Sequence, residues 1–545
     1  MPRATSSSFV TVVELAATGA QAKKLRSKFE AARQVYNACL GEALKRLRLM
    51  REARAWQRAG QMPKGKERTT VYRELQQQFG FREYDLHKWC TQFTRSWINE
   101  HIGSKTVNAI ASRAFKSAEE FLYAAGKRRP PRFRRRGELR SVEGKARSCC
   151  HWKGDHIAWK GVSVPAIIED DTDEVLKHGL QSRVKYVRMV RKIIRGKERF
   201  YAQLVCEGTA FCKPSHKPRR GRVGIDIGTQ TIAVVGGKRA YLGVFCDGLE
   251  RNDTKIRRIQ RAMDRSRRAC NPDNFDEEGR IRSQGNQRLK WVESKRYLQL
   301  RKRLREMLRQ EAEFRKNLHG QLVAQVLTFG DDIWLENINY QSWAKRKTQK
   351  ATGHRKKSYG RSVSRRAPGF FEQRLISEAE KWGASVTRFP TKTTKLSQTC
   401  HCGHVEKKKL HIRWHRCKQC GAVGQRDLYS AFLAQFVEGN RLKADQAQKA
   451  WPSSCAALEA ALSDIKHASG MPSSLGLRSR DRAARLQNCG QTAGKIVDVV
   501  PAEKSDRESH KEPVENHNNT IFSRPETHLS QDSTGSSDIS GVDSG

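Results

Sequence analysis

The segment GIDIGTQTIAVV, residues 224–235, constrains the fold of this chain more than any other stretch. Two apolar runs flank small and polar residues, and a single carboxylate, Asp226, lies inside the first run. Short apolar runs bounded by turn residues are typical of buried strands. We therefore expect two strands joined by a tight turn, with one acidic side chain close to that turn.

Two chemistries use such a strand, acidic residue, glycine turn and second strand. In one, the carboxylate helps to hold a divalent metal ion that cuts a phosphodiester. In the other, the turn cradles the phosphates of ATP, as in the actin and sugar-kinase group, whose first phosphate loop is similar to DIGT. A phosphotransferase of that group would need a second Asp-Gly phosphate loop and a glycine-rich adenosine site. The sequence contains no convincing copy of either.

Two more acidic residues fit the metal-binding alternative. Glu336 lies late in the predicted strand DDIWLENI, and Asp427 begins the predicted helix in GQRDLYSAFLAQF. If the strands are neighbours in one sheet, the three carboxylates converge and can hold two hard cations about 3.5 to 4 Å apart. Each residue also has an ordinary explanation, as a turn residue, a strand end and a favourable charge at a helix N-terminus. The order of all three, with a cysteine cluster before the last, favours the metal site.

Four of the fourteen cysteines cluster in SQTCHCGHVEKKKLHIRWHRCKQCGAVGQRD. Two knuckles, Cys400-x-Cys402 and Cys417-x-x-Cys420, are each followed by glycine and are separated by fourteen residues. This spacing predicts a tetrahedral, structural zinc ribbon. The first knuckle is one residue shorter than the usual C-x-x-C, and His401 could replace one thiolate. Two unrelated thiol pairs are the alternative.

The charge of the chain indicates its partners. The 545 residues include 106 Lys and Arg against 57 Asp and Glu, a formal net charge of +49. A folded protein with this excess repels itself unless a polyanion neutralises it, so we expect a nucleic acid. No apolar stretch approaches the ~20 residues of a membrane span, and the N-terminus does not have the pattern of a signal peptide. Scattered cysteines outside the cluster favour a reducing cytoplasm, where a nucleic-acid-binding protein of a prokaryote would be nucleoid-associated.

Hydrophobic periodicity predicts a small β unit interrupted by helices in the first 210 residues. Residues 8–16 have strand character, and the three- and four-residue spacing of apolar side chains predicts amphipathic helices over 25–47 and 105–123, with further helix at 86–102. Strands return after residue 150, with a hairpin around Gly196. Later elements are a broken helical region at 251–328, strands at 331–338 and 384–390, a basic loop at 357–373 and a helix that ends at Gly383.

The segment GKRRPPRFRRRGELR, residues 126–140, is the most basic stretch of the N-terminal part. Eight of its fifteen residues are Lys or Arg, and its paired prolines exclude a regular helix. Such a segment can neutralise phosphates, although a solvated basic face has the same composition. The candidate nucleic-acid contacts are Lys127, Arg128, Arg129, Arg132, Arg134, Arg135 and Arg136.

Together, the motifs resemble one family over roughly residues 8–440. GIDIG, then WLENI, then a cysteine cluster running into QRDLYSAFLA is similar to the split RuvC nuclease of transposon-encoded TnpB proteins and compact type V CRISPR effectors. ARQVYNACL and AFKSAEEFLYAAGKRRPPRFRRRGELRS resemble that family's first recognition helix and its helix with a basic segment. SRRAPGFFEQRLISEAEKWGASVTRFPTKTTKLSQTC resembles its run from the second RuvC strand to the ribbon. Where the family's third motif usually has asparagine, this chain has Tyr429.

The resemblance implies an α/β multidomain RNA-guided DNA endonuclease. An RNase H-like RuvC domain with an inserted zinc ribbon would cut target DNA, and an N-terminal β-barrel wedge with a helical recognition insertion would hold the guide RNA and heteroduplex. The implied ligands are Asp226, Glu336 and Asp427 for two catalytic Mg²⁺ ions, and Cys400, Cys402, Cys417 and Cys420 for one structural Zn²⁺. A nuclease-dead RNA-guided binding protein is the alternative from another class, and the sequence does not separate a transposon protein from a CRISPR effector.

The implied domains have the following boundaries. They are a wedge-like β domain (1–18 and 141–215), a helical recognition lobe (19–140), RuvC motifs I and II with a helical insertion (216–395), a zinc ribbon that binds target nucleic acid (396–424), the RuvC motif III helix (425–465) and a disordered tail (466–545).

Overall fold

The computed structural model describes residues 7–124, 129–144, 149–169, 173–249, 252–282, 289–344, 359–409, 412–465 and 475–476. They all belong to one compact unit, Met1–Thr492. The predicted tail lies outside the described residues except at Leu475, which is buried, and Gly476, whose carbonyl accepts a hydrogen bond from Trp414 Nε1 at 3.2 Å.

Across these ranges, we find no helix with the length and apolar character needed to cross a membrane.

The first 207 residues combine β-sheets with a helical insertion, as predicted. β1 (Ser8–Leu15) pairs with β7 (Lys197–Glu207), and β6 (Val184–Ile194) and β2 (Ser141–Gly144) complete an antiparallel sheet in the order β1-β7-β6-β2. The predicted hairpin turns at Arg195 and Gly196, which have φ of 50° and 78°, because a two-residue turn of this kind needs positive φ. β3 (His151–Trp152), β4 (His156–Ala158) and β5 (Ser163–Pro165) form a second sheet. These strands form two separate sheets among the described residues, so the β-barrel remains a prediction.

Helices fill the segment between β1 and β2. α1 (Gly19–Glu52) begins with a capping box in which Thr18 and Gln21 exchange side-chain-to-backbone hydrogen bonds. The predicted apolar face of α1 is buried and packs on α6 (Ser104–Leu122). The other helices of the first 207 residues are α2 (Arg54–Gln61), α3 (Lys66–Gln78), α4 (Glu83–Cys90), α5 (Ile98–His101) and α7 (Glu174–Gln181).

A five-stranded sheet organises the second part of the chain, in the order β10-β9-β8-β11-β12. β8 (Arg222–Ile227), β9 (Thr231–Gly236) and β10 (Arg239–Val244) are antiparallel neighbours. β11 (Asp332–Glu336) and β12 (Ser385–Phe389) run parallel to β8. The chain is therefore a mixed α/β protein.

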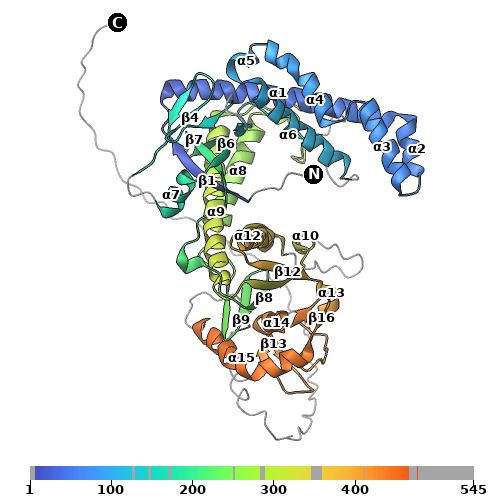
Figure 1. Cartoon of the computed structure of the whole chain (residues 1–545), viewed down its shortest axis with the longest axis vertical. Helices are drawn as coiled ribbons and strands as arrows, with labels where there is room; N and C mark the ends of the chain where they lie inside the picture. Colours follow the sequence, from blue (N-terminus) through green and yellow to red (C-terminus); the bar gives the residue numbers. More distant parts are fainter. Residues whose placement is uncertain are drawn as a thin grey trace, which may run out of the picture. The chain divides into compact units, whose positions relative to one another are not determined.

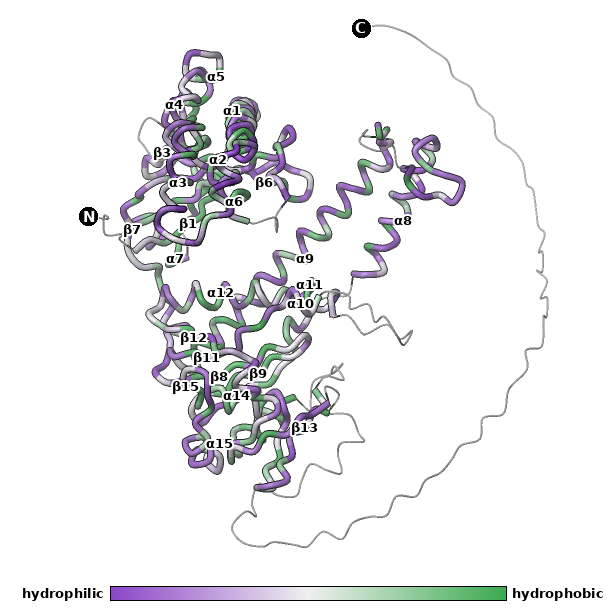
Figure 2. Tube along the Cα trace, turned by 90° about the vertical axis from the view of Figure 1, so that its right-hand side faces the viewer, coloured by the Kyte–Doolittle hydropathy of each residue, from purple (hydrophilic) through white to green (hydrophobic). Residues whose placement is uncertain are grey.

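Helices cover both faces of this sheet (Figure 1). α9 (Lys295–Leu327) and α12 (Pro368–Lys381) pack on the face formed by Val223, Ile225 and Ile227. α14 (Arg426–Ala434) and α15 (Ala444–Ile465) cover the opposite face. Hydrophobic residues concentrate on the strands in Figure 2, whereas α8 (Asp253–Ala269) and much of α9 are hydrophilic. The layer order places α14 directly against β8 and β9.

Two local predictions were wrong. The helix expected at 86–102 is interrupted twice: α4 passes into a 3-10 turn at Thr91–Arg95, and Ser96 is then extended, with its hydroxyl accepting the Ile98 N–H. The basic loop expected at 357–373 contains α11 (Gly360–Arg366), which ends where Ala367 adopts φ of 48° before α12 begins. The Arg366 side chain donates to the Phe245 carbonyl at 2.8 Å, so a long-range contact stabilises this helix. The remaining short elements are α10 (Tyr340–Ala344), α13 (Thr391–Thr394), β13 (Trp414–Arg416), β14 (Val423–Gln425), β15 (Val437–Glu438) and β16 (Arg441–Leu442).

Candidate functional site

Asp226 and Glu336 lie at the carboxyl ends of neighbouring parallel strands. β8 and β11 pair as far as Ile225 and Leu335, and the next residue of each strand is the predicted acidic one. Because parallel strands end at the same edge of a sheet, the two carboxylates lie at one edge. Side chains alternate along a strand, and Ile225 and Leu335 face α9 and α12. Asp226 and Glu336 therefore face the side that α14 covers.

α14 carries Asp427 in its first turn and approaches β8 very closely. Gly224 permits this approach, because a Cβ there would lie 2.0 Å from the carbonyl oxygen of Ala431. The Asp427 side chain is buried, and its Oδ2 accepts a hydrogen bond from Thr231 Oγ1 at 3.0 Å. Since Thr231 begins β9, this bond ties the first turn of α14 to the chain that follows Asp226.

The site is unfavourable for the ionised forms of Asp226 and Glu336. Burial raises the pKa of Asp226 well above its ordinary value, and the charges of Asp427 and Glu336 raise it further. Burial alone raises the pKa of Glu336 to about 7. Two guanidinium groups oppose this repulsion: Arg413 and Arg426 each lie 3.7 Å from Asp427 Oδ1 and lower the pKa of Asp226. Acids held together with raised pKa are typical of a cation site or a catalytic site.

The donor set fits hard divalent cations. Carboxylate oxygens are the protein ligands that Mg²⁺ prefers. Within the described ranges, only the four cysteines bring three or more potential ligand atoms within 4.8 Å of one another, so the three carboxylates are spaced more widely than that. Such a spacing still permits Mg²⁺, which one or two carboxylates usually hold while water completes its coordination shell.

Sequence reasoning did not identify three residues that contact Asp427. Thr231 lies within GIDIGTQT, and Arg426 directly precedes Asp427, so both had a positional signal. Arg413 had none. It reaches the site because its carbonyl accepts the Arg426 N–H at 2.8 Å, where the ribbon joins α14.

The four predicted cysteines converge in the ribbon. Cys400 Sγ lies 3.4 Å from Cys420 Sγ, and Cys402 Sγ lies 3.6 Å from Cys417 Sγ. A tetrahedral zinc ion with Zn–S bonds of about 2.3 Å separates its sulfurs by ~3.8 Å, so the group fits structural zinc. His401 is not a member of this group. Gly403 and Gly421 turn the two knuckles at φ of 87° and 71°.

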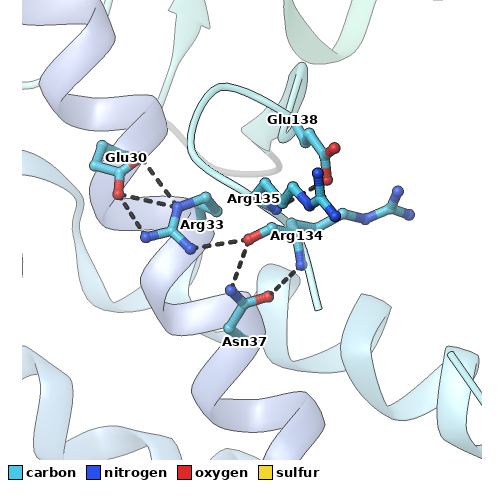
Figure 3. A network of polar contacts seen from close by, with 6 residues as sticks. All are labelled: Glu30, Arg33, Asn37, Arg134, Arg135 and Glu138. Atoms are coloured by element: carbon cyan, nitrogen blue, oxygen red, sulfur yellow. Dashed lines mark hydrogen bonds and ion pairs between the residues drawn. The ribbon is translucent and has the colours of Figure 1, made fainter. Parts of the chain in front are cut away.

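The described part of the basic segment is held against α1 by its backbone (Figure 3). The Arg134 N–H donates to Asn37 Oδ1 at 2.8 Å, and its carbonyl accepts from Asn37 and Arg33, each at 2.9 Å. Glu30 in turn holds the Arg33 guanidinium at 2.6 Å. Backbone anchoring leaves the cationic side chains exposed; these are Arg129, Arg132, Arg134, Arg135 and Arg136. Lys127 and Arg128 lie outside the described residues.

Comparisons with known proteins bear on the segment from α12 to α14. Residues 369–433 match the family model described as Cas12f1-like, TNB domain. None of the curated proteins matches the chain. A cryo-EM structure of a Cas12f1–sgRNA–target DNA complex covers 78% of this chain and 98% of that chain, with 12% identity and a TM-score of 0.38. A CRISPR-Cas12f ternary complex covers 76% and 82%, with 12% identity and a TM-score of 0.23.

Residues 369–433 are thus similar to the Cas12f1-like TNB domain, and this match supports the resemblance to the compact type V CRISPR and TnpB-like nuclease family that the sequence motifs indicate.

Proposed function

We propose that the protein is an RNA-guided DNA endonuclease that hydrolyses phosphodiesters at Asp226, Glu336 and Asp427. The observation that carries the proposal is the placement of these carboxylates by β8, β11 and α14 around one edge of one sheet, with Asp427 inside the segment that matches the Cas12f1-like TNB model. The sheet supports an RNase H-like (RuvC) assignment, because three antiparallel strands are followed by two strands parallel to the first.

In this proposal, Asp226 and Glu336 would bind the cations, and Thr231 orients Asp427. Two Mg²⁺ ions bound there would activate the attacking water and stabilise the leaving oxygen. Asp226 and Glu336 would hold the cations in their ionised form, so binding would release the protons that burial favours on these two carboxyl groups. Thr231 fixes one oxygen of Asp427 and leaves the other beside Arg413 and Arg426.

The proposed partners are a guide RNA and target DNA. A structure of a Cas12f1 protein has been determined in complex with sgRNA and target DNA. Nucleic acids of this kind would also neutralise a chain of net charge +49. The anchored basic segment is the proposed RNA contact, and the four cysteines are the proposed zinc ligands of a target-binding ribbon. The wedge, recognition, RuvC and ribbon boundaries given above, and a cytoplasmic, nucleoid-associated location, belong to the same proposal.

Cleavage of a plasmid that matches the co-purified RNA tests this function. Glu336→Gln keeps the size of the side chain and removes a metal ligand, so cleavage should fall by more than the ~10- to 100-fold typical of losing an outer-shell partner. Glu380→Gln, an exposed glutamate on α12, is the matched control and should cleave like wild type.

Binding measured in the same samples separates the two candidate functions. RNA-dependent binding of the plasmid by all three proteins, with cleavage by wild type and the control alone, supports the nuclease. The same binding without cleavage by any of them contradicts it and supports an RNA-guided binding protein that acts by occupancy.

A further inference from the structure

Tyr429 presents its hydroxyl to the first cysteine knuckle from inside α14. The Tyr429 Oη lies 3.2 Å from Cys400 Sγ and 2.8 Å from His401 Nδ1, and it accepts the backbone N–H of His401 at 2.9 Å. The side chain is fully buried. Three polar contacts thus converge on one buried atom of α14.

Aromatic rings fix the position of this hydroxyl. His415 of β13 stacks on the Tyr429 ring at 4.0 Å between centroids and 15° between planes. Trp451 of α15 meets the ring edge-on at 5.1 Å and stacks on His401 at 4.9 Å. The ring is therefore held between β13 and α15, and the hydroxyl cannot swing away without disturbing both.

The number of hydrogen bonds that a phenol can make limits the partners of the Tyr429 hydroxyl. A phenol donates one hydrogen bond and accepts two. The His401 N–H occupies one acceptor position, so the O–H points either to Cys400 Sγ or to His401 Nδ1. In both arrangements the bond joins α14 to the knuckle that contains Cys400.

Asp427 lies two residues before Tyr429 on the same helix. At about 100° per residue, these two side chains leave α14 on nearly opposite sides. Asp427 is tied to Thr231 at the sheet, and Tyr429 is tied to the knuckle. The first turn of α14 is thus anchored at both the carboxylate site and the cysteine site.

We propose that Tyr429 is a positioning residue that transmits the order of the zinc site to Asp427. The role of Asp427 in cleavage rests on the proposed function, whereas the link from zinc to α14 rests on contacts alone. Zinc held by the four cysteines would fix Cys400 and its neighbour His401, and the Tyr429 hydroxyl would then fix the first turn of α14. Loss of this hydroxyl should weaken zinc binding by the cysteines and make the first turn of α14 less ordered.

The test uses full-length, zinc-loaded Tyr429→Phe, which keeps the ring and removes only the oxygen. Tyr36→Phe is the matched control, because Tyr36 is also buried and its hydroxyl bonds Ser117 in the N-terminal part at 3.3 Å. Zinc transfer to a chelator dye should be about 10- to 100-fold faster in Tyr429→Phe than in wild type, as for other outer-shell partners. The control should release zinc at the wild-type rate.

Hydrogen exchange measures the second half of the link. Removing zinc from wild type should lower the protection of the α14 amides. In Tyr429→Phe, the α14 amides should be less protected than in wild type even with zinc bound. Removing zinc from this variant should lower their protection only slightly further. If Tyr429→Phe released zinc at the wild-type rate, the hydroxyl would not stabilise the zinc site. If zinc removal left the protection of the wild-type α14 amides unchanged, the zinc site would not order α14. Neither readout uses cleavage, so an inactive wild type contradicts the proposed function without deciding this inference.

Discussion

At the scale of single residues, the carboxyl group of Glu336 lies where the protein disfavours its ionised form. Its pKa is raised to about 7 because burial penalises the charged form. Between pH 4.5 and 7 the folded protein therefore keeps a proton that the unfolded chain has lost, and the free energy of unfolding falls as pH rises. A bound cation removes this penalty, since it stabilises the ionised carboxylate.

Glu336→Gln should consequently stabilise the magnesium-free protein in a pH-dependent way. The neutral amide avoids the ionisation penalty, which is about 3 kcal/mol at pH 8 and less than about 1 kcal/mol at pH 5 for a pKa of about 7. Chemical denaturation at both pH values, with Glu380→Gln as control, measures the difference. Equal stabilisation at pH 5 and pH 8 would show that Glu336 is not held in a charge-excluding site.

The sequence singles out these three acidic residues because each has a local signature. Asp226 lies inside an apolar run, Glu336 lies late in one, and Asp427 begins a helix. Two long-range contacts near the site, of Arg413 with Asp427 and of Tyr429 with Cys400, were not predicted. The contacts of Arg413 and Tyr429 join residues that meet only after the ribbon folds, and no local pattern encodes such a meeting.

At the scale of elements, the site depends on how closely α14 lies on β8. Gly224 has no side chain, and a Cβ would overlap the carbonyl oxygen of Ala431 at 2.0 Å and approach the Cβ of Ala434 at 2.8 Å. Neither contact can be relieved by rotating a flexible side chain. A methyl group at this position must push the helix outward and move Asp427 away from Asp226.

Gly224→Ala should therefore reduce both stability and cleavage. Overpacking of this kind costs about 1–3 kcal/mol, and a displacement of about 1 Å at a catalytic group lowers the rate by roughly 100-fold. Denaturation and plasmid cleavage measure the two effects. Gly19→Ala, where a Cβ meets nothing within 4 Å, should behave like wild type. Full cleavage by Gly224→Ala would contradict the close packing.

The element predictions succeeded where periodicity was strong and failed where distant contacts decide. The apolar faces of α1 and α6 and the hairpin around Gly196 follow directly from the sequence. α11 was missed because its residues are polar and basic, and its arginines find their partners in distant backbone carbonyls such as that of Phe245.

At the scale of the whole molecule, the net charge of +49 indicates that the protein binds a polyanion. The basic segment carries part of this charge on arginines whose backbone is hydrogen-bonded to α1. Reversal of Arg134, Arg135 and Arg136 to Glu should weaken RNA binding and reduce its salt dependence, by about 2 in the slope of log K against log salt for three lost phosphates. The matched control reverses the exposed Lys64, Lys66 and Arg73 on and beside α3, with the same change in charge. Equal effects in both variants would mean that total charge, not this segment, binds the RNA.

The central claim is that Asp226, Glu336 and Asp427 form one site for paired divalent cations. Anomalous scattering from Mn²⁺ in crystals of the RNA-bound, zinc-loaded protein tests it most directly, because it locates the ions. The account predicts Mn²⁺ peaks among these three carboxylates that vanish in Asp226→Asn. Mn²⁺ bound elsewhere, with no peak beside the ends of β8 and β11, would contradict it.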